Sequence, residues 1–382
     1  MVAAVRRGAS QRSVARRFGV SLSTVQHWVD RAAKQRLDRV DWSDRRKASR
    51  RAPNRTPPWL EDRVLDKRTE LKRSILGECG AVVIRETLVA EGILAPSVRT
   101  IGRILARRGL VDRHRRLRRP PPPPGWHLPP VRERTIELEL FDFIEMLKLA
   151  NGPLVDILTG VALHAGAPMA VPLIHATTTS VLDCLRSHWQ AHGLPGYAQF
   201  DNDTRFQGAH QHRDVFGRVV RLCLQLGITP VFVPPREFGF QNPVETFNGL
   251  WQRKVWDRYH FESFPALTDH SIQYLTARRQ RLGARIATAP ARLPWPQDWQ
   301  WKPSQLPAGT VIYLRRTSER GKVTFLGHSW LIDPHWCHRL IRAEVDLRQH
   351  EIRCFALRRN APTEQPLLQV MPYDYPKPDL VL

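Results

Sequence analysis

The chain has 382 residues, of which 42% are hydrophobic, so it is long enough to fold into roughly two to four domains with buried cores. Its formal charge of +23 at pH 7 predicts a polyanionic partner. The sequence has no apolar run of about 18 residues and no signal-peptide core, and its five cysteines form no CxxC pair. These features exclude a membrane protein, a disulfide framework and a Cys-rich zinc site, and they predict a cytoplasmic protein.

The positive charge is concentrated in the first third of the chain. Residues 1–130 contain 30 Lys and Arg against 12 Asp and Glu, whereas residues 131–382 contain 29 against 24. A clustered basic segment is the electrostatic footprint of a nucleic-acid-binding region. The sequence therefore predicts that the first third binds nucleic acid and that the nearly neutral remainder holds an acid-bearing enzyme core.

Residues 8–33 have the pattern of a helix-turn-helix. Two stretches with helical spacing of apolar residues are separated by Gly19, and Ser21 can cap the second helix. The second helix would expose polar side chains that can reach base edges or phosphates. These residues are Ser23, Thr24, Gln26 and His27. We predict a DNA-binding unit over residues 1–50, and a small structural hairpin is the alternative.

Residues 58–118 have the periodicity of a second helical unit, which we expect to be similar to a helix-turn-helix. Ser97 can cap its last helix, and Arg99 and Arg103 lie along that helix. Basic side chains at this spacing suit a helix that enters the major groove of DNA. The alternative is an Arg-rich surface helix that binds no ligand.

The remaining two thirds of the chain predict a multidomain fold with two linkers. Residues 119–131 contain five consecutive prolines, which favour a semi-rigid polyproline II spacer. Residues 132–285 then follow the order β-β-β-α-β-α-β-α, which predicts a central α/β domain built on a mixed sheet. Residues 286–307 are rich in Pro and Trp and predict another linker. Residues 308–382 alternate short apolar runs with turns, as a small antiparallel β-barrel does.

Three acidic residues of the central domain stand in positions that suit metal binding. Asp142 lies in the middle of the first predicted strand, and Asp201 ends the fourth. Glu245 lies just inside a helix that Asn242 could cap, with Pro243 as its first residue. A carboxylate in an apolar strand is costly unless it is paired or binds a metal. If the first and fourth strands are neighbours, the two aspartates can share an Mg²⁺ ion and Glu245 can complete a second metal position.

Three segments resemble the integrase core of the DDE superfamily, the RNase H-like fold of retroviral-type integrases and many bacterial insertion-sequence transposases. They are FDFIE (141–145), FDNDTRF (200–206) and FQNPVETFNGLWQRKVW (240–256). The resemblance implies that Asp142, Asp201 and Glu245 are catalytic and bind two Mg²⁺ or Mn²⁺ ions. It also places an asparagine, Asn202, beside the second acid. Asn248 lies on the same helical face as Glu245 and would contact DNA or a metal-bound water.

The function that this resemblance implies is that of a DNA transposase or integrase. Such an enzyme binds the ends of its element, cleaves their 3′ ends and joins them to target DNA. Its partners are then double-stranded DNA, as element ends and as target, and further copies of the same chain. It would act in the bacterial cytoplasm, on the nucleoid. A non-catalytic helix-turn-helix protein from a decayed element is the alternative, and a structure-selective nuclease of the same fold is a third possibility.

The sequence departs from the family pattern in three respects, one of which is that the retroviral-type His/Cys zinc module is absent. Asp203 stands where the family usually has glycine, and 43 residues separate Asp201 from Glu245, more than is usual. We expect the additional residues to form a surface loop over 207–218, in which two histidines are solvated. Three further acids are not expected to carry the chemistry. They are Glu145, Asp156 and Asp183.

Overall fold

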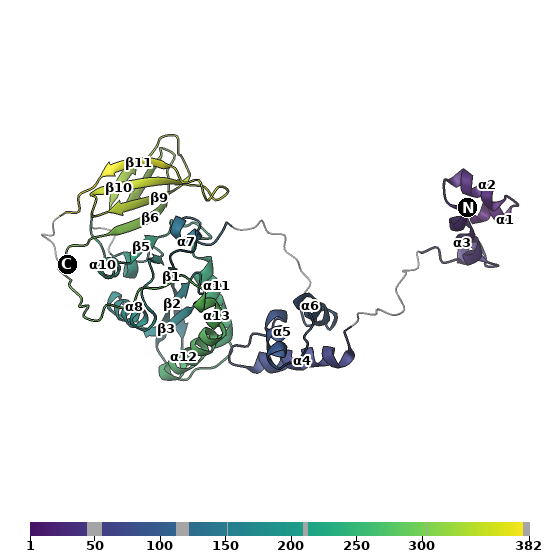
Figure 1. The fold of residues 1–382 in the computed structure, drawn as a ribbon, viewed down its shortest axis with the longest axis horizontal. Helices are drawn as coiled ribbons and strands as arrows, with labels where there is room; N and C mark the ends of the chain where they lie inside the picture. Colours follow the sequence, from purple (N-terminus) through teal and green to yellow (C-terminus); the bar gives the residue numbers. More distant parts are fainter. Residues whose placement is uncertain (44–55, 112–121, 151, 209–212, 304, 377–382) are drawn as a thin grey trace. The chain divides into compact units, whose positions relative to one another are not determined.

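The computed structural model describes residues 1–43, 56–111, 122–150, 152–208, 213–303 and 305–376. The chain divides into two compact units, residues 1–58 and residues 59–382. Each unit is described by itself below (Figure 1). No helix in the described residues has the length and apolar character that crossing a bilayer requires.

The first unit is a small helical domain with the predicted helix-turn-helix. Its elements are α1 (Val2–Arg6), α2 (Gln11–Phe18), α3 (Leu22–Ala32) and the short 3₁₀ helix η1 (Leu37–Arg39). Gly19 ends α2 with a left-handed φ of 62°, and the Ser21 side chain caps α3 by accepting a hydrogen bond from the backbone of Thr24. The turn and the second helix are therefore confirmed. The helix α1 was not predicted.

Three helices open the second unit, as the sequence predicts for this segment. They are α4 (Pro58–Arg73), α5 (Ala81–Ala90) and α6 (Val98–Arg107), and Ser97 caps the last. They share a small buried core that includes Val64, Ile84 and Ile101. The predicted linker that follows contributes to the main core of the unit, because Trp126 and Leu128 are buried. The proline run itself is described only from residue 122.

The central domain has the predicted mixed sheet with helices on both faces. Its elements are α7 (Pro129–Arg132), β1 (Leu138–Lys148), β2 (Leu154–Ala162), β3 (Pro168–Ile174), α8 (Thr178–His192), β4 (Tyr197–Phe200), α9 (Thr204–Gln207), α10 (Arg218–Gln225), β5 (Thr229–Phe232), α11 (Asn242–Trp251), the π-helical turn η2 (Gln252–Trp256), α12 (Phe264–Arg281) and α13 (Gly283–Ala287). The order β-β-β-α-β-α-β-α is confirmed, apart from the short α9. The helices α12 and α13 were missed.

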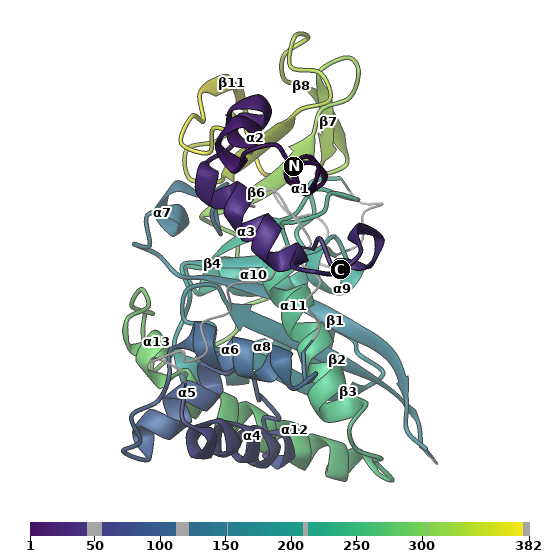
Figure 2. The same cartoon turned by 90° about the vertical axis from the view of Figure 1, so that its right-hand side faces the viewer.

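The sheet separates two apolar cores. β1, β2 and β3 are antiparallel neighbours, and β4 and β5 continue from β1 as parallel strands. One core lies under α8 and α10, whereas the other lies under α11 and α12. Side chains of a strand alternate between the two cores, as in any pleated strand. In Figure 2, α11 crosses the face of β1 and β2, and it contacts both strands.

The C-terminal region is β-rich, as predicted, but its strands extend the central sheet. It contains β6 (Thr310–Arg316), β7 (Lys322–Phe325), β8 (His328–Leu331), β9 (Leu340–Asp346), β10 (Glu351–Leu357) and β11 (Leu367–Pro372). β6 pairs with β5 in parallel, and the described strands form a nine-stranded sheet in the order β11-β10-β9-β6-β5-β4-β1-β2-β3 (Figure 1). A separate hairpin pairs β7 with β8.

This continuity differs from the independent barrel expected over residues 308–382. The reason lies in β6, where Val311 and Tyr313 enter one core and Ile312 and Leu314 enter the other. A strand buried on both faces belongs to the interior of a sheet. The stretch expected as a linker over 286–307 also packs, since Leu293 pairs with Leu194 and three tryptophans contact the core.

Candidate active site

Asp142 lies on β1, and Asp201 directly follows the neighbouring parallel strand β4. The pairing of β1 with β4 ends at Leu140 and Gln199, and Asp142 and Asp201 each follow two residues later. The two carboxylates therefore lie at the same level of the sheet. Leu140 and Ile144 belong to the core under α11. Asp142 lies two residues from each of them, so its side chain is on the same face of the strand and faces α11 as well.

The helix α11 brings the glutamate to this face. It begins at Asn242, so Asn242 is its first residue and Gln241 is the N-cap, without a side-chain capping bond. The prediction of Asn242 as the N-cap was therefore wrong by one residue. Glu245 is exposed in the first turn, where the helix dipole favours a negative charge. Asn248 follows one turn later and donates a hydrogen bond of 2.8 Å from Nδ2 to Oδ2 of Asp142.

The electrostatics of Asp142 link the three acids. The pKa of Asp142 is raised to about 6. Burial is the largest cause of this rise, and the negative charges of Asp201 and Glu245 contribute to it. Hydrogen bonds from the Phe143 backbone and from Asn248 oppose the rise. The pKa of Asp201 is raised as well, mainly by burial. Asp142 therefore lies close enough to both Asp201 and Glu245 for their charges to raise its pKa, a repulsion that a cation would relieve.

The donor set suits a hard divalent ion in its chemistry. All three residues offer carboxylate oxygens, which Mg²⁺ prefers, and Mg²⁺ takes only one or two carboxylates from a protein. Across the ranges that the structure describes, there is no group of three or more His, Cys, Asp or Glu side chains that could hold one metal ion.

Asp203, the departure from the family pattern, has a structural role. It is the N-cap of α9, and its carboxylate also binds Arg205, with Nη2 of the arginine at 2.6 Å. Arg205 forms a further ion pair with Glu145, and its guanidinium lies 3.8 Å from the centre of the Phe143 ring. The charge of Asp203 is thus neutralised locally. The negative charge of Asp203 raises the pKa of Asp201, and the positive charge of Arg205 lowers it.

The three acids expected not to carry the chemistry are accounted for by other contacts. Glu145 binds Arg205 as described. Asp156 accepts a hydrogen bond of 3.1 Å from the backbone of Met146, next to an irregularity in the pairing of β1 with β2. Asp183 is exposed on α8 and lies 3.7 Å from Arg186. These contacts agree with structural roles for all three.

Asn202 links the site to the C-terminal region. Its Nδ2 donates to the carbonyl of Val233 at 2.8 Å, and its Oδ1 accepts from Arg315 at 3.0 Å. Arg315 is buried on β6, and burial lowers the pKa of its guanidinium to about 10. In the sequence, the only indication that Arg315 has such a role is its position at the end of an apolar run.

The predicted insert over 207–218 is only partly at the surface. Phe216 is buried and stacks on Tyr375 at a ring distance of 5.2 Å. An aromatic residue in a polar stretch was the available signal for this contact. His210 and His212, which were expected to be solvated, lie outside the described residues.

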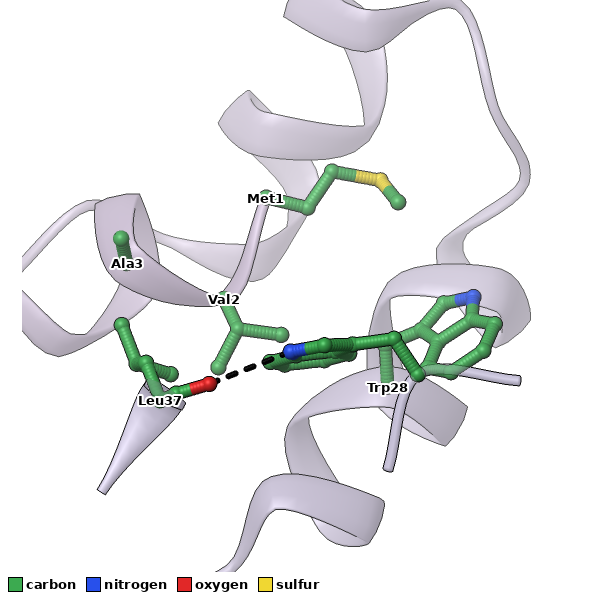
Figure 3. A pocket seen from close by; sticks show the side chains of 6 residues that line it. Met1, Val2, Ala3, Trp28 and Leu37 are labelled. Carbon is green, nitrogen blue, oxygen red and sulfur yellow. Dashed lines mark hydrogen bonds between the residues drawn. The ribbon is translucent and has the colours of Figure 1, made fainter. Parts of the chain in front are cut away.

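The predicted DNA-reading residues of the first unit lie at the start of α3. Ser23, Gln26 and His27 are exposed, whereas Thr24 is half-buried. The hydroxyl of Ser21 lies 2.8 Å from those of Ser23 and Thr24, so these two side chains hydrogen-bond to the capping residue. Elsewhere in the unit lies an apolar cavity of about 360 Å³, with Trp28 and Leu37 in its wall (Figure 3).

The basic residues of α6 fall into two groups. Arg107 and Arg108 are paired with acids of α4, and the shortest of these contacts joins Arg107 to Glu61 at 2.6 Å. Arg99 and Arg103 are exposed, and neither forms an ion pair with any residue that the structure describes. The two predicted phosphate-binding arginines are thus the ones that no neighbouring acid neutralises.

Comparisons with known proteins agree with this architecture at the level of the fold. Residues 1–40 match the model of the homeodomain-like domain family. A search of the curated proteins finds no match. The chain therefore has a homeodomain-like helix-turn-helix, a central mixed α/β domain and a β-rich C-terminal region.

Among solved structures, several retroviral integrases are similar to the chain. The catalytic core of the HTLV-2 integrase, in complex with magnesium, is 15% identical over 36% of this chain and 82% of its own, with a TM-score of 0.29. The simian T-cell lymphotropic virus intasome, in complex with a PP2A regulatory subunit, is 15% identical over 72% and 88%, with a TM-score of 0.33. The BIV integrase core is 20% identical over 37% and 81%, with a TM-score of 0.29. These likenesses are distant, and no residue role follows from them.

Proposed function

We propose that this chain is a metal-dependent DNA transposase or integrase. The observation that supports it most is the position of Asp142, a half-buried carboxylate in the central sheet whose pKa responds to both Asp201 and Glu245. A protein tolerates such a repulsive group where a bound cation offsets it. The same chain carries a homeodomain-like helix-turn-helix, so the acidic site and a DNA-binding module occur together.

Each residue of the site has a distinct role in this proposal. Asp142 and Asp201 would hold one Mg²⁺ or Mn²⁺ ion, and Asp142 and Glu245 a second. When bound, two such ions activate the attacking oxygen and stabilise the leaving oxygen of a phosphodiester. Asn248 fixes the orientation of the Asp142 carboxylate through the 2.8 Å hydrogen bond. No side chain needs to act as a covalent nucleophile, because water attacks in the cleavage step and a DNA 3′-hydroxyl attacks in strand transfer.

The basic N-terminal third would hold the ends of the element. The exposed side chains of α3 would contact bases or phosphates, and Arg99 and Arg103 of α6 would contact phosphates. Two ends must be paired before they are joined, so the active species would contain more than one copy of the chain. In this proposal the protein comes from a bacterial insertion sequence and acts on the nucleoid.

A strand-transfer assay tests the proposal. The full chain is incubated with labelled DNA from the ends that flank its gene, in Mg²⁺, in Mn²⁺ or in EDTA. The proposal predicts nicked ends and joined products in either metal and none in EDTA. If the protein binds the ends but gives no product in either metal, it is a non-catalytic DNA-binding protein. Cleavage of any branched DNA without joining would instead identify a structure-selective nuclease.

A further inference from the structure

A chain of buried side-chain hydrogen bonds connects the elements that carry the three acids. Gln199 lies on β4, two residues before Asp201, and is fully buried. Its Nε2 donates to the carbonyl of Phe240 at 2.8 Å and to Oε1 of Gln241 at 3.1 Å. Gln241 is the N-cap of α11, four residues before Glu245, and its Nε2 donates to the carbonyl of Phe141 on β1 at 3.2 Å.

The third residue of this hydrogen-bond network, His127, comes from the segment after the proline run. Its Nε2 lies 2.8 Å from Oε1 of Gln199, and the residue is only 3% exposed. Because the amide nitrogen of Gln199 already donates twice, its oxygen must accept, so Nε2 of His127 carries the proton. Burial lowers the pKa of His127 to about 4, so the ring is neutral and keeps this single donor role near neutral pH.

At His127 the hydrogen-bond network is connected to the C-terminal strands. The carbonyl of His127 accepts a hydrogen bond of 2.7 Å from Arg342 on β9, and Arg342 also binds Glu344 at 2.9 Å. His127 therefore cannot move without disturbing a buried arginine. The hydrogen bonds run from β9 through His127 and Gln199 to Gln241, and from there to the backbone next to Asp142.

We propose that His127, Gln199 and Gln241 are positioning residues that set the separation of Glu245 from Asp142 and Asp201. The inference rests on the proposed function, since it concerns the same site. The N-terminus of α11 has no side-chain capping bond of its own. Its position relative to β1 and β4 is therefore held by apolar packing, which has no direction, and by the directional bonds of Gln241 and of the Phe240 carbonyl. The bond from Asn248 to Asp142 lies further along the helix, beyond Glu245. A shift of this end would move Glu245 while leaving the aspartates in place.

Binding of Mn²⁺ to the full chain, followed by the EPR signal of the free ion, tests the inference without requiring catalysis. Gln199→Met keeps the length of the side chain and removes its hydrogen bonds. His127→Phe keeps an aromatic ring and removes the donor, whereas His127→Gln keeps a donor near the position of Nε2. We expect both Gln199→Met and His127→Phe to weaken Mn²⁺ binding roughly tenfold, as residues that orient metal ligands do. His127→Gln should restore binding.

A matched control separates positioning from loss of stability. His164 is similarly buried, and its Nε2 contacts the carbonyl of Val131 at 2.8 Å, away from the elements that carry the acids. His164→Phe should lower the melting temperature and leave Mn²⁺ binding at the wild-type level. If Gln199→Met or His127→Phe does not fold, Gln241→Met tests the same hydrogen-bond network at the N-cap of α11.

The outcomes distinguish this inference from the proposed function. Wild-type Mn²⁺ binding in cooperatively folding Gln199→Met, His127→Phe or Gln241→Met would overturn the inference and leave the metal site intact. Equal weakening by His164→Phe would also overturn it, because the effect would then come from stability alone. A wild-type chain that binds no Mn²⁺ would contradict the proposed function itself, and the inference with it.

Discussion

The side-chain amide of Asn248 donates a hydrogen bond of 2.8 Å to Oδ2 of Asp142. This contact joins α11 to β1 at the centre of the candidate site. We predict that Asn248→Ala lowers the rate of strand transfer by about 10-fold to 100-fold, the usual effect of losing a residue that orients a metal ligand. The rate is measured at saturating metal, and Asn248→Gln tests the role of the amide. Full activity in Asn248→Ala would show that the contact is incidental.

The ion pair of Arg205 with Asp203 gives a second prediction, which concerns how the charges next to Asp201 affect stability and activity. Arg205→Ala leaves Asp203 and Glu145 without their shared cation, and we expect a loss of about 1–3 kcal/mol in the free energy of unfolding. Metal-dependent activity should fall too, because Arg205 opposes the rise in the pKa of Asp201. Adding Asp203→Gly should recover part of the activity, as a double-mutant cycle would measure.

The control for this cycle is an ion pair on α8. Arg186 lies 3.7 Å from Asp183, and the Asp183 side chain is exposed whereas that of Arg186 is half-exposed. Arg186→Ala should change the free energy of unfolding by less than about 1 kcal/mol. Additive effects of Arg205→Ala and Asp203→Gly would mean that the two residues are not coupled in function.

The buried His127 predicts a pH dependence of stability. Its pKa is about 4 in the folded chain and near the ordinary 6.5 when unfolded, so the unfolded state binds the proton more tightly. The contribution is fully present above pH 6.5 and is lost as the pH falls through about 4. It amounts to at most about 3 kcal/mol. Urea unfolding at pH 7 and at pH 4 should show a smaller acid destabilisation for His127→Gln than for the wild type, and an equal loss in both would be inconsistent with a buried neutral ring.

The exposed arginines of α6 predict a salt-dependent effect on DNA binding. Arg99→Ala and Arg103→Ala should each weaken binding to every sequence and reduce the slope of log K against log salt by about 1. Arg107→Ala is the matched control, because Arg107 is paired with Glu61 at 2.6 Å. Fluorescence anisotropy over a series of salt concentrations measures all three. A larger effect from Arg107→Ala than from the other two would mean that α6 does not contact DNA through these residues.

The sequence was sufficient for features that depend on local periodicity. The alternation of the neighbours of Asp142 between the two cores, the capping residues Ser21 and Ser97 and the order of strands and helices all follow from short windows, and the structure confirms them. The C-terminal region was predicted only as β-rich, because nothing local shows that β6 pairs with β5. That pairing depends on two cores that meet β6 from opposite faces.

The site was predictable in its acids and not in their surroundings. Asp142, Asp201 and Glu245 stand out by placement, but the bonds that hold them come from residues far apart in the sequence. His127, Gln199 and Gln241 are ordinary polar residues until the fold buries them together. Arg205 could have been paired with Asp203 from sequence, since they are two residues apart, whereas its contact with Glu145 required the register of β1.

Strand transfer by isosteric variants of the three acids tests the central claim most directly. Asp142→Asn, Asp201→Asn and Glu245→Gln each remove a negative charge and keep the shape of the side chain. The account predicts that all three variants bind end DNA like the wild type and yield no joined product in Mg²⁺. Joined product at the wild-type level in all three would contradict it.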